Sequence, residues 1–235
     1  PHNPRGTHQW RIASSRRNTT IGKSPGTSGG GVLRDSTADR ISWTLWVHRT
    51  RWTWGCSRSC GTVTSAAGVR IGYWGWGSCL QDFNNDGHLD IFHVNGFPVL
   101  PASQFHADPA RFFVGDGDGT FTERSADLGI LSTEQGRGVV CFDIERDGDL
   151  DLFVQNNTGA VRFFRNDLMN GNHWLTVRLV GGNGNVFGIG ARVSIRTALG
   201  TQIREISAGS NYLSSNPSEA HFGLGPATTV LELEV

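Results

Sequence analysis

Short stretches of apolar residues, each bounded by turn-forming residues, recur along the chain from Gly72 onward. Runs of roughly four to eight residues rich in Val, Ile, Phe and Thr are typical of β-strands. No long amphipathic helix pattern interrupts them, although residues 123–130 leave room for one helical turn. The pattern therefore predicts an all-β fold with these strands: LDIFHV, RFFVG, GTFTE, LDLFVQ, AVRFF, HWLTVRLV, ARVSIRT, TQIREIS and TTVLELEV.

The alternation is clearest in HWLTVRLV, which covers residues 173–180. Successive side chains of an extended strand point to opposite faces. One face of this strand is mostly apolar and is predicted to pack inward: His173, Leu175, Val177 and Leu179. In the strands that follow, Arg192 and Arg204 are predicted to lie on solvent-exposed sheet faces rather than to bind a partner.

An internal repeat organises the middle of the chain. The stretch DFNNDGHLD at residues 82–90 recurs as DIERDGDLD at residues 143–151, an offset of 61 residues. At the same offset Gly75, Gly77, Phe92 and Asn95 correspond to Gly136, Gly138, Phe153 and Asn156. Repeats of this length, rich in short strands, indicate a propeller or a solenoid. Because two units cannot close a propeller of about four to eight blades, we predict a partial β-propeller whose other blades lie upstream or elsewhere.

The first acidic stretch places oxygen-bearing side chains at alternate positions. Its candidate donors are the side chains of Asp82, Asn84, Asp86 and Asp90, together with the main-chain carbonyl of His88. Hard oxygen ligands of this kind suit Ca²⁺, which binds about six to eight of them. Carboxylates held this close also repel one another unless a cation compensates their charge. The stretch is therefore predicted to be a structural calcium site, with Gly87 supplying the turn.

The second stretch offers a similar set of donors. They are the side chains of Asp143, Glu145, Asp147 and Asp151 and the main-chain carbonyl of Asp149. Glu145 is longer than the Asp or Asn usual at its position, which alters the geometry there. We predict a second calcium site at this stretch.

Neither stretch has the pattern of an EF-hand, which needs a bidentate Glu at about position 12 and flanking helices. Position 12 is His93 in the first repeat and Val154 in the second, and both lie in predicted strands. The alternative without metal is an Asx-rich turn that caps a strand. The segment GDGDG at residues 115–119 holds only Asp116 and Asp118, and it is predicted to be a turn rather than a third site.

The chain has four cysteines: Cys56, Cys60, Cys79 and Cys141. No pair has the spacing of a zinc ribbon, and a disulfide framework is not expected in a chain of this length. Cys79 and Cys141 are predicted to be small, buried apolar residues.

Residues 1–70 differ from the rest in charge and composition. They hold 11 basic and 2 acidic side chains, whereas residues 71–235 hold 10 basic and 19 acidic ones, although the whole chain has a formal net charge of zero. Three interpretations remain open: a basic arm that binds nucleic acid, a disordered tail, or an out-of-frame translation of GC-rich DNA. We favour the third, and nucleic-acid binding is the least expected.

Catalytic and membrane signals were not found in the sequence. There is no G-x-S-x-G or H-E-x-x-H motif, and IGKS at residues 21–24 lacks the preceding glycine of a phosphate loop. No apolar run reaches the roughly 18 residues of a membrane span. The chain begins with Pro1 rather than Met, so the lack of a visible secretion signal is uninformative.

The two acidic loops, each followed by an L-D-[IL]-F strand, resemble FG-GAP repeats, also called VCBS-type repeats, which form the calcium-loop blades of integrin-like β-propellers. The later series NDLMNGNHWLTVRL, GIGARV, REISAGSNYLSSNP and HFGLG is similar to the ASPIC/UnbV domain. That domain follows FG-GAP blades in the cartilage acidic protein family. We expect the SNYLSSN loop to be a turn packed by Tyr212 rather than a ligand contact.

The resemblance implies a domain organisation. Residues 71–168 would be two propeller blades and residues 169–235 an ASPIC/UnbV domain that stops before the family's last turn. Residues 1–70 stay unassigned, because the family would have further acidic blades there.

The resemblance also implies a function. It favours a non-enzymatic, calcium-binding scaffold that is secreted, periplasmic or at the cell surface and binds a protein or carbohydrate ligand. The alternative is an enzyme, or an enzyme's partner, whose active site lies on other propeller blades.

Overall fold

The computed structural model describes residues 64–97, 105–168, 170–182 and 184–235, together with the backbone of four short strands before them. Those strands are β1 (Arg11–Ala13), β2 (Thr20–Ile21), β3 (Leu45–His48) and β4 (Arg51–Trp54). Strands and turns, but no helix, make up this part of the chain, so the predicted all-β fold is confirmed. The helical turn considered at residues 123–130 is a set of hydrogen-bonded turns.

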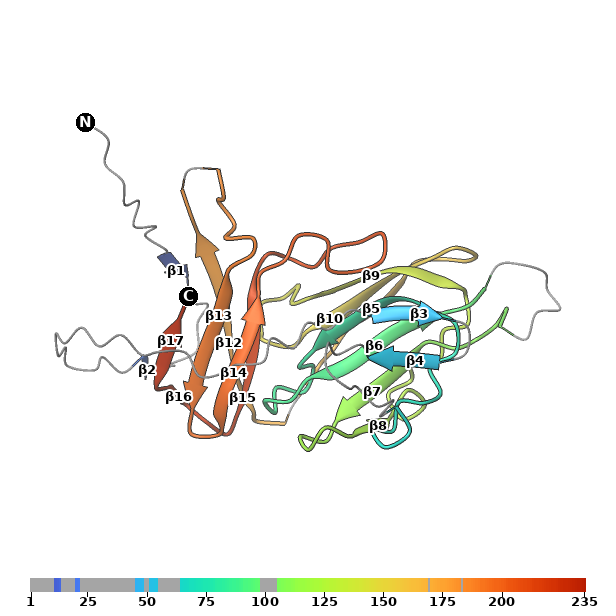
Figure 1. Ribbon diagram of the computed structural model, residues 1–235, viewed down its shortest axis with the longest axis horizontal. Helices are drawn as coiled ribbons and strands as arrows, with labels where there is room; N and C mark the ends of the chain where they lie inside the picture. The colour runs from blue at the N-terminus through green and yellow to red at the C-terminus, as the bar shows by residue number, and fades with distance from the viewer. Residues whose placement is uncertain are drawn as a thin grey trace.

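Two antiparallel sheets form the repeat half of the molecule, on the right in Figure 1. The first has the order β5-β6-β7-β8 and the second the order β11-β10-β9. The first acidic stretch connects β5 to β6, and the second connects β9 to β10. The strands are β5 (Gly75–Gln81), β6 (Asp90–Asn95), β7 (Arg111–Gly115), β8 (Phe121–Glu123), β9 (Gly136–Phe142), β10 (Asp151–Asn156) and β11 (Arg162–Phe164).

The two sheets share one hydrophobic core in which Phe92 and Val139 are fully buried. Glycines allow the sheets to approach closely. A Cβ at Gly77 would collide with the main-chain oxygen of Arg137, and one at Gly136 would collide with the side chain of Val94. Glycine is therefore required at these positions by packing between the sheets.

Residues on the outer face of the second sheet are equivalent to residues that are buried in the first sheet. Phe92 pairs with Phe112 across β6 and β7, and the equivalent Phe153 pairs with Phe163 across β10 and β11. Phe92 is 0% exposed because the second sheet covers it, whereas Phe153 is 36% exposed. Each repeat thus presents the same apolar face, but only the face of the first sheet is covered.

A disulfide joins the two sheets. It links Cys79 in β5 to Cys141 in β9, two residues whose Cα atoms lie 6.5 Å apart. The prediction that these cysteines are simple apolar core residues is therefore wrong. Both are indeed buried, but their pairing depends on the side-by-side packing of two strands that are 62 residues apart in sequence.

The C-terminal half, on the left in Figure 1, has a separate core. Strand β12 pairs with β15 and with β1, β13 lies between β14 and β17, and β16 pairs with β2. The predicted inward face of β12 is confirmed for Leu175, Val177 and Leu179, whereas His173 is exposed. The strands are β12 (His173–Val180), β13 (Arg192–Thr197), β14 (Gly200–Glu205), β15 (Ala220–Gly225), β16 (Thr229–Val230) and β17 (Glu232–Glu234).

The three interpretations of residues 1–70 concern mainly residues outside the described ranges. Within that segment the structure places the backbone of β1 to β4 and the turn at residues 64–70, where the Ala67 carbonyl accepts a hydrogen bond from the Phe121 amide. The predicted domain boundaries remain predictions.

Candidate functional site

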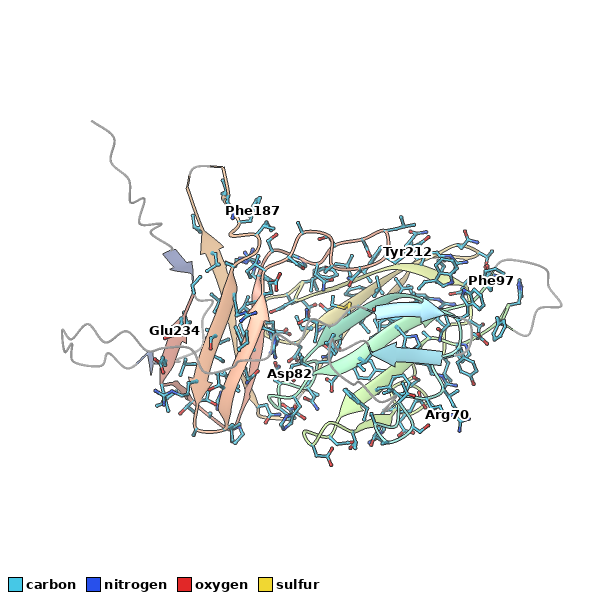
Figure 2. The ribbon with its side chains drawn as sticks, viewed as in Figure 1. Arg70, Asp82, Phe97, Phe187, Tyr212 and Glu234 are labelled. Carbon is cyan, nitrogen blue, oxygen red and sulfur yellow. A yellow bond between two sulfur atoms is a disulfide. The ribbon has the colours of Figure 1, made fainter. Side chains whose placement is uncertain are left out.

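The two acidic loops lie next to each other where the repeat half meets the C-terminal half, and Figure 2 labels Asp82 at this junction. Asn85 of the first loop donates a hydrogen bond from Nδ2 to the Gly148 carbonyl of the second loop, at 2.9 Å. The fold thus brings together two motifs that are 61 residues apart in sequence.

The first loop closes around its own carboxylates. Asp82 is fully buried and accepts hydrogen bonds from the amides of Asp86 and Gly87, at 3.1 and 2.8 Å. Asp86 accepts one from the His88 amide at 2.8 Å, and the Asn84 side-chain oxygen accepts one from the Asp86 amide at 3.0 Å. Gly87, with φ of 97°, provides the left-handed turn that the sequence predicted.

The second loop repeats this arrangement. Asp143 accepts from the amides of Asp147 and Gly148, at 3.1 and 2.9 Å, and Asp147 accepts from the Asp149 amide at 3.1 Å. Glu145 departs from it, because its carboxylate forms an ion pair with Arg165 at 3.3 Å. The Glu145 carboxylate thus lies beside the Arg165 guanidinium, and its part in the second site stays a prediction.

The last carboxylate of each loop ties the loop to the sheet. Asp90 is fully buried and accepts from the amides of Phe83 and Gly115, both at 2.9 Å. Asp151 accepts in the same way from the amides of Ile144 and Asn166, at 3.2 and 2.9 Å. These contacts use one lone pair of each oxygen and leave others for a further partner.

Burial disfavours the ionised form of several of these carboxylates and so raises their pKa values. It raises the pKa of Asp82 to about 6 and the pKa of Asp90 to about 7, and neighbouring carboxylates add to both shifts. In the second loop, burial and then the charge of Asp147 raise the pKa of Asp149 to about 6, and burial also raises the pKa of Asp143. A cation beside these groups would favour their charged forms.

The donor set fits a hard cation better than a soft one. Among the described residues, no three His, Cys, Asp or Glu side chains are gathered as a metal cluster. The loops instead offer mixed oxygen donors, in which the Asn84 amide and main-chain carbonyls join the carboxylates. Calcium takes such sets, whereas zinc prefers His and Cys.

Strand β15 packs directly on the first loop. The Gly225 amide donates to the Asn85 carbonyl at 2.8 Å, and His221 Nε2 lies 2.8 Å from the side-chain oxygen of Asn85. A Cβ at Gly223 would collide with the Asp82 carboxylate. The histidine and both glycines of the HFGLG motif thus contact the acidic loop, which sequence reasoning had missed.

The segment between the halves binds the same loop. Asn166 Nδ2 donates to the Phe83 carbonyl at 2.9 Å. Asn170 and Asn172 donate from their side-chain nitrogens to the Asn84 carbonyl, at 2.6 and 3.0 Å. The asparagines of NDLMNGN therefore satisfy main-chain oxygens of the first loop.

Arg204 is not on a solvated face, so that prediction is wrong. Its guanidinium donates to the His221 carbonyl at 3.1 Å and to the Gln202 side chain at 3.0 Å, and it lies over the Phe222 ring. Burial lowers the pKa of Arg204 to about 10, against an opposing effect of the nearby Asp82 charge. The prediction of an exposed Arg192 is confirmed.

The SNYLSSN loop covers the edge of β9. Asn211 Nδ2 donates to the Val139 carbonyl at 2.7 Å, Ser214 Oγ accepts from the Val139 amide at 3.1 Å, and Asn216 Oδ1 accepts from the Cys141 amide at 2.9 Å. Unpaired edge strands invite wrong pairing unless something covers them. Tyr212 packs against Trp76 with ring centroids 5.1 Å apart, so the expected aromatic packing of this turn is confirmed.

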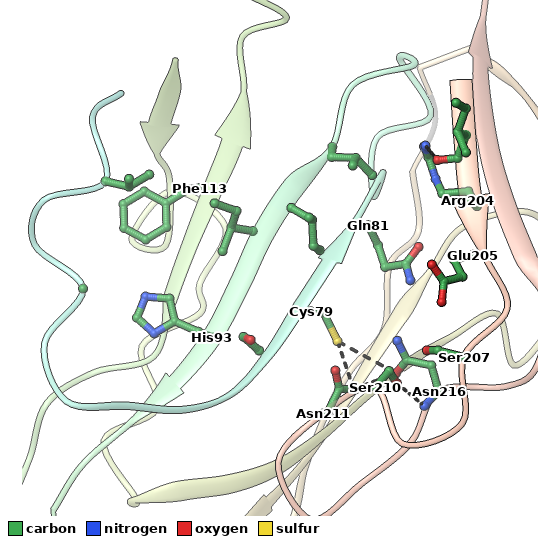
Figure 3. A pocket seen from close by; sticks show the side chains of 17 residues that line it. Cys79, Gln81, His93, Phe113, Arg204, Glu205, Ser207, Ser210, Asn211 and Asn216 are labelled. Carbon is green, nitrogen blue, oxygen red and sulfur yellow. Dashed lines mark hydrogen bonds between the residues drawn. The ribbon is translucent and has the colours of Figure 1, made fainter. Parts of the chain in front are cut away.

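A cavity of about 500 Å³ lies between the first sheet and the C-terminal half (Figure 3). One wall is apolar and includes Leu80 and Ile91, on the face of the first sheet opposite to Phe92. The other wall is polar and includes Arg204, Asn211 and Asn216, beside the disulfide residue Cys79. Its asparagines already bind β9, as described above.

Most of the C-terminal half is similar to a known protein family. Residues 181–235 match the family described as ASPIC and UnbV. The HFGLG strand and the SNYLSSN loop, which make the contacts described above, both lie within the ASPIC/UnbV match.

A longer stretch of the chain is similar to cartilage acidic protein 1. The human protein is 31% identical over 156 residues, and the mouse and Xenopus tropicalis proteins are 30% and 29% identical over the same length. Each match covers 61% of this chain and 22% of the relative. The chain therefore spans less than a quarter of the length of these relatives.

The described residues include no helix long and apolar enough to cross a lipid bilayer.

Proposed function

We propose that this protein is a non-enzymatic, calcium-binding scaffold that acts in binding or adhesion outside the cytoplasm. One observation carries the proposal: two equivalent loops hold buried or partly buried carboxylates in an arrangement rich in oxygen donors, and burial raises the pKa values of Asp82, Asp90 and Asp143. A divalent cation would compensate these charges, whereas a plain Asx turn has no need to bury so many.

The calcium ligands would come from the residues that the sequence singled out. In the first loop they are Asp82, Asn84, Asp86, Asp90 and the carbonyl of His88. In the second they are Asp143, Glu145, Asp147, Asp151 and the carbonyl of Asp149. When bound, the ion would supply charge compensation and hold each loop closed, which is a structural role.

The two sheets would be blades of a β-propeller. The first three strands of each have the same antiparallel order, and the two sheets pack face to face and follow one repeat. A further sheet of the same type would bury Phe153 and Phe163, as the second sheet buries Phe92 and Phe112. Propellers present loops from several blades on one surface, and such surfaces suit the binding of a protein or carbohydrate ligand.

A location outside the cytoplasm has two supports. The Cys79–Cys141 disulfide is of a kind that persists in oxidising compartments and is rare in the cytosol. The similarity to proteins named cartilage acidic protein 1 points the same way.

Calcium titration of the whole chain by calorimetry tests the proposal. We expect saturable binding with a dissociation constant of about 10⁻⁴ to 10⁻³ M, as in extracellular modules. The variant with Asp82, Asp86, Asp143 and Asp147 all changed to Asn should lose it. Asp116→Asn with Asp118→Asn is the matched control, because both residues lie in the acidic GDGDG turn. Absence of binding by folded wild-type protein would refute the calcium sites.

A further inference from the structure

We propose that calcium binding by the first loop and docking of the ASPIC/UnbV domain onto the repeats are one linked equilibrium. The inference rests on the proposed calcium site and adds a partner to it: strand β15, with its HFGLG motif, recognises the loop in its closed form. Nothing in the sequence pattern indicates this link, because the loop and the strand are separated by more than 130 residues.

The first loop has two sets of oxygens that face different partners. Its side-chain oxygens at Asp82, Asn84 and Asp86 accept hydrogen bonds from within the loop. Its main-chain oxygens at Phe83 and Asn84 accept from the linking segment, and the oxygen of Asn85 accepts from β15. A change in how the loop closes around its carboxylates therefore moves the carbonyls that hold the C-terminal half.

Asn85 is the centre of this contact. It is 2% exposed and has a left-handed φ of 59°. Its side chain connects the Gly148 carbonyl of the second loop with His221 Nε2 of β15, while its main-chain oxygen binds the Gly225 amide. Both loops and the C-terminal half thus contact Asn85. Its backbone conformation is part of the first loop and changes when that loop changes.

Close approach is built into both sides. Gly223 lies so near the loop that a Cβ there would collide with the Asp82 carboxylate and the Asn85 backbone. The second loop has an equivalent restriction, because a Cβ at Gly148 would collide with the Trp174 indole of β12. At these glycines, each loop therefore contacts a strand of the C-terminal half with no room for a side chain between them.

Linkage is reciprocal for binding free energies. If calcium strengthens the docking, then weakening the docking lowers calcium affinity by the same factor, typically about 5- to 150-fold for coupled sites. A strand far away in sequence would then control the affinity of a loop whose ligands it does not replace.

Amide hydrogen exchange on the wild-type chain, with calcium or with excess chelator, is the first test. The Gly225 amide reports the contact directly, because it donates to the Asn85 carbonyl. We expect its exchange to accelerate at least fivefold in chelator. Amides between β13 and β14, such as that of Ile195, are the internal control and should change little.

Calcium affinity of a docking variant is the second test. His221→Ala should weaken calcium binding at least fivefold, because it removes the contact to the Asn85 side chain, which is not a proposed ligand. His173→Ala, at an exposed position of β12, is the matched control. If His221→Ala does not fold, the exchange experiment still tests the linkage, because it needs no variant.

The outcomes separate this inference from the function on which it rests. Calcium binding by wild type, with unchanged Gly225 exchange and unchanged affinity in the docking variant, would overturn the linkage and leave the calcium sites intact. No calcium binding by wild type would overturn both. Faster exchange in chelator together with weaker binding by His221→Ala would support the linkage.

Discussion

The protonation state of a buried residue in this protein depends on its surroundings more than on its residue type. His93, in β6, is 3% exposed, and its Nδ1 lies 3.1 Å from the Asn95 side-chain oxygen. Burial, assisted by the charge of Arg111, lowers the pKa of His93 to about 4 from its ordinary value of 6.5. The histidine is therefore held neutral in the folded chain.

A pH dependence of stability follows for His93. The pKa of His93 is lower in the folded chain than in the unfolded chain, so protonation favours unfolding. The free energy of unfolding is therefore highest above pH 6.5, and it falls as the pH drops toward 4. The loss should approach roughly 3 kcal/mol at the acid end. Urea unfolding between pH 7 and 4 should show a shallower decline for His93→Gln than for wild type. His173→Gln, at an exposed position, is the control, and equal slopes in all three proteins would contradict the prediction.

At the scale of elements, the repeat makes two sheets whose equivalent residues have different surroundings. Phe92 and Phe153 occupy the same position, yet the first is 0% exposed and the second 36% exposed. The repeat pattern gives the two residues equivalent positions. Their exposure differs because the second sheet packs on Phe92, whereas no described sheet packs on Phe153.

This pair allows a matched test. Phe92→Ala should cost about 3–5 kcal/mol of unfolding free energy, because it leaves a cavity between the sheets. Phe153→Ala should cost less than about 1 kcal/mol, since the residue faces outward and little packing is lost. Chemical denaturation of both variants measures the difference. Similar losses would mean that something covers the outer face of the second sheet in solution.

At the scale of the whole molecule, three joints hold the parts together. The disulfide connects the two sheets. The SNYLSSN loop covers β9, and the HFGLG strand lies on the first acidic loop. The SNYLSSN loop and the HFGLG strand, both within the stretch that matches the ASPIC and UnbV family, therefore contact the repeats besides forming part of the C-terminal half.

Reduction should weaken the first of these joints. Removing a cross-link that spans 62 residues should lower the unfolding free energy by about 2–5 kcal/mol. Denaturation with and without reductant measures this loss. The double variant Cys79→Ala with Cys141→Ala should match reduced wild type and show no response to reductant. A response of equal size in that variant would assign the effect to other cysteines.

The sequence by itself determined what depends on neighbours along the chain. Strand positions follow from alternation within a few residues, as the buried Leu175, Val177 and Leu179 show. The two acidic loops were found in the same way, because all their candidate oxygens fall within nine residues and glycine marks the turn. Their repetition revealed two equivalent sheets.

Only the tertiary structure decided what depends on residues far apart in sequence. It paired Cys79 with Cys141, placed the partly buried Arg204 near Asp82, and set His221 against Asn85. None of these contacts has a periodicity or spacing that a sequence pattern could show. They arise because sheets pack by the fit of whole faces, and that fit brings together side chains that local rules treat as independent.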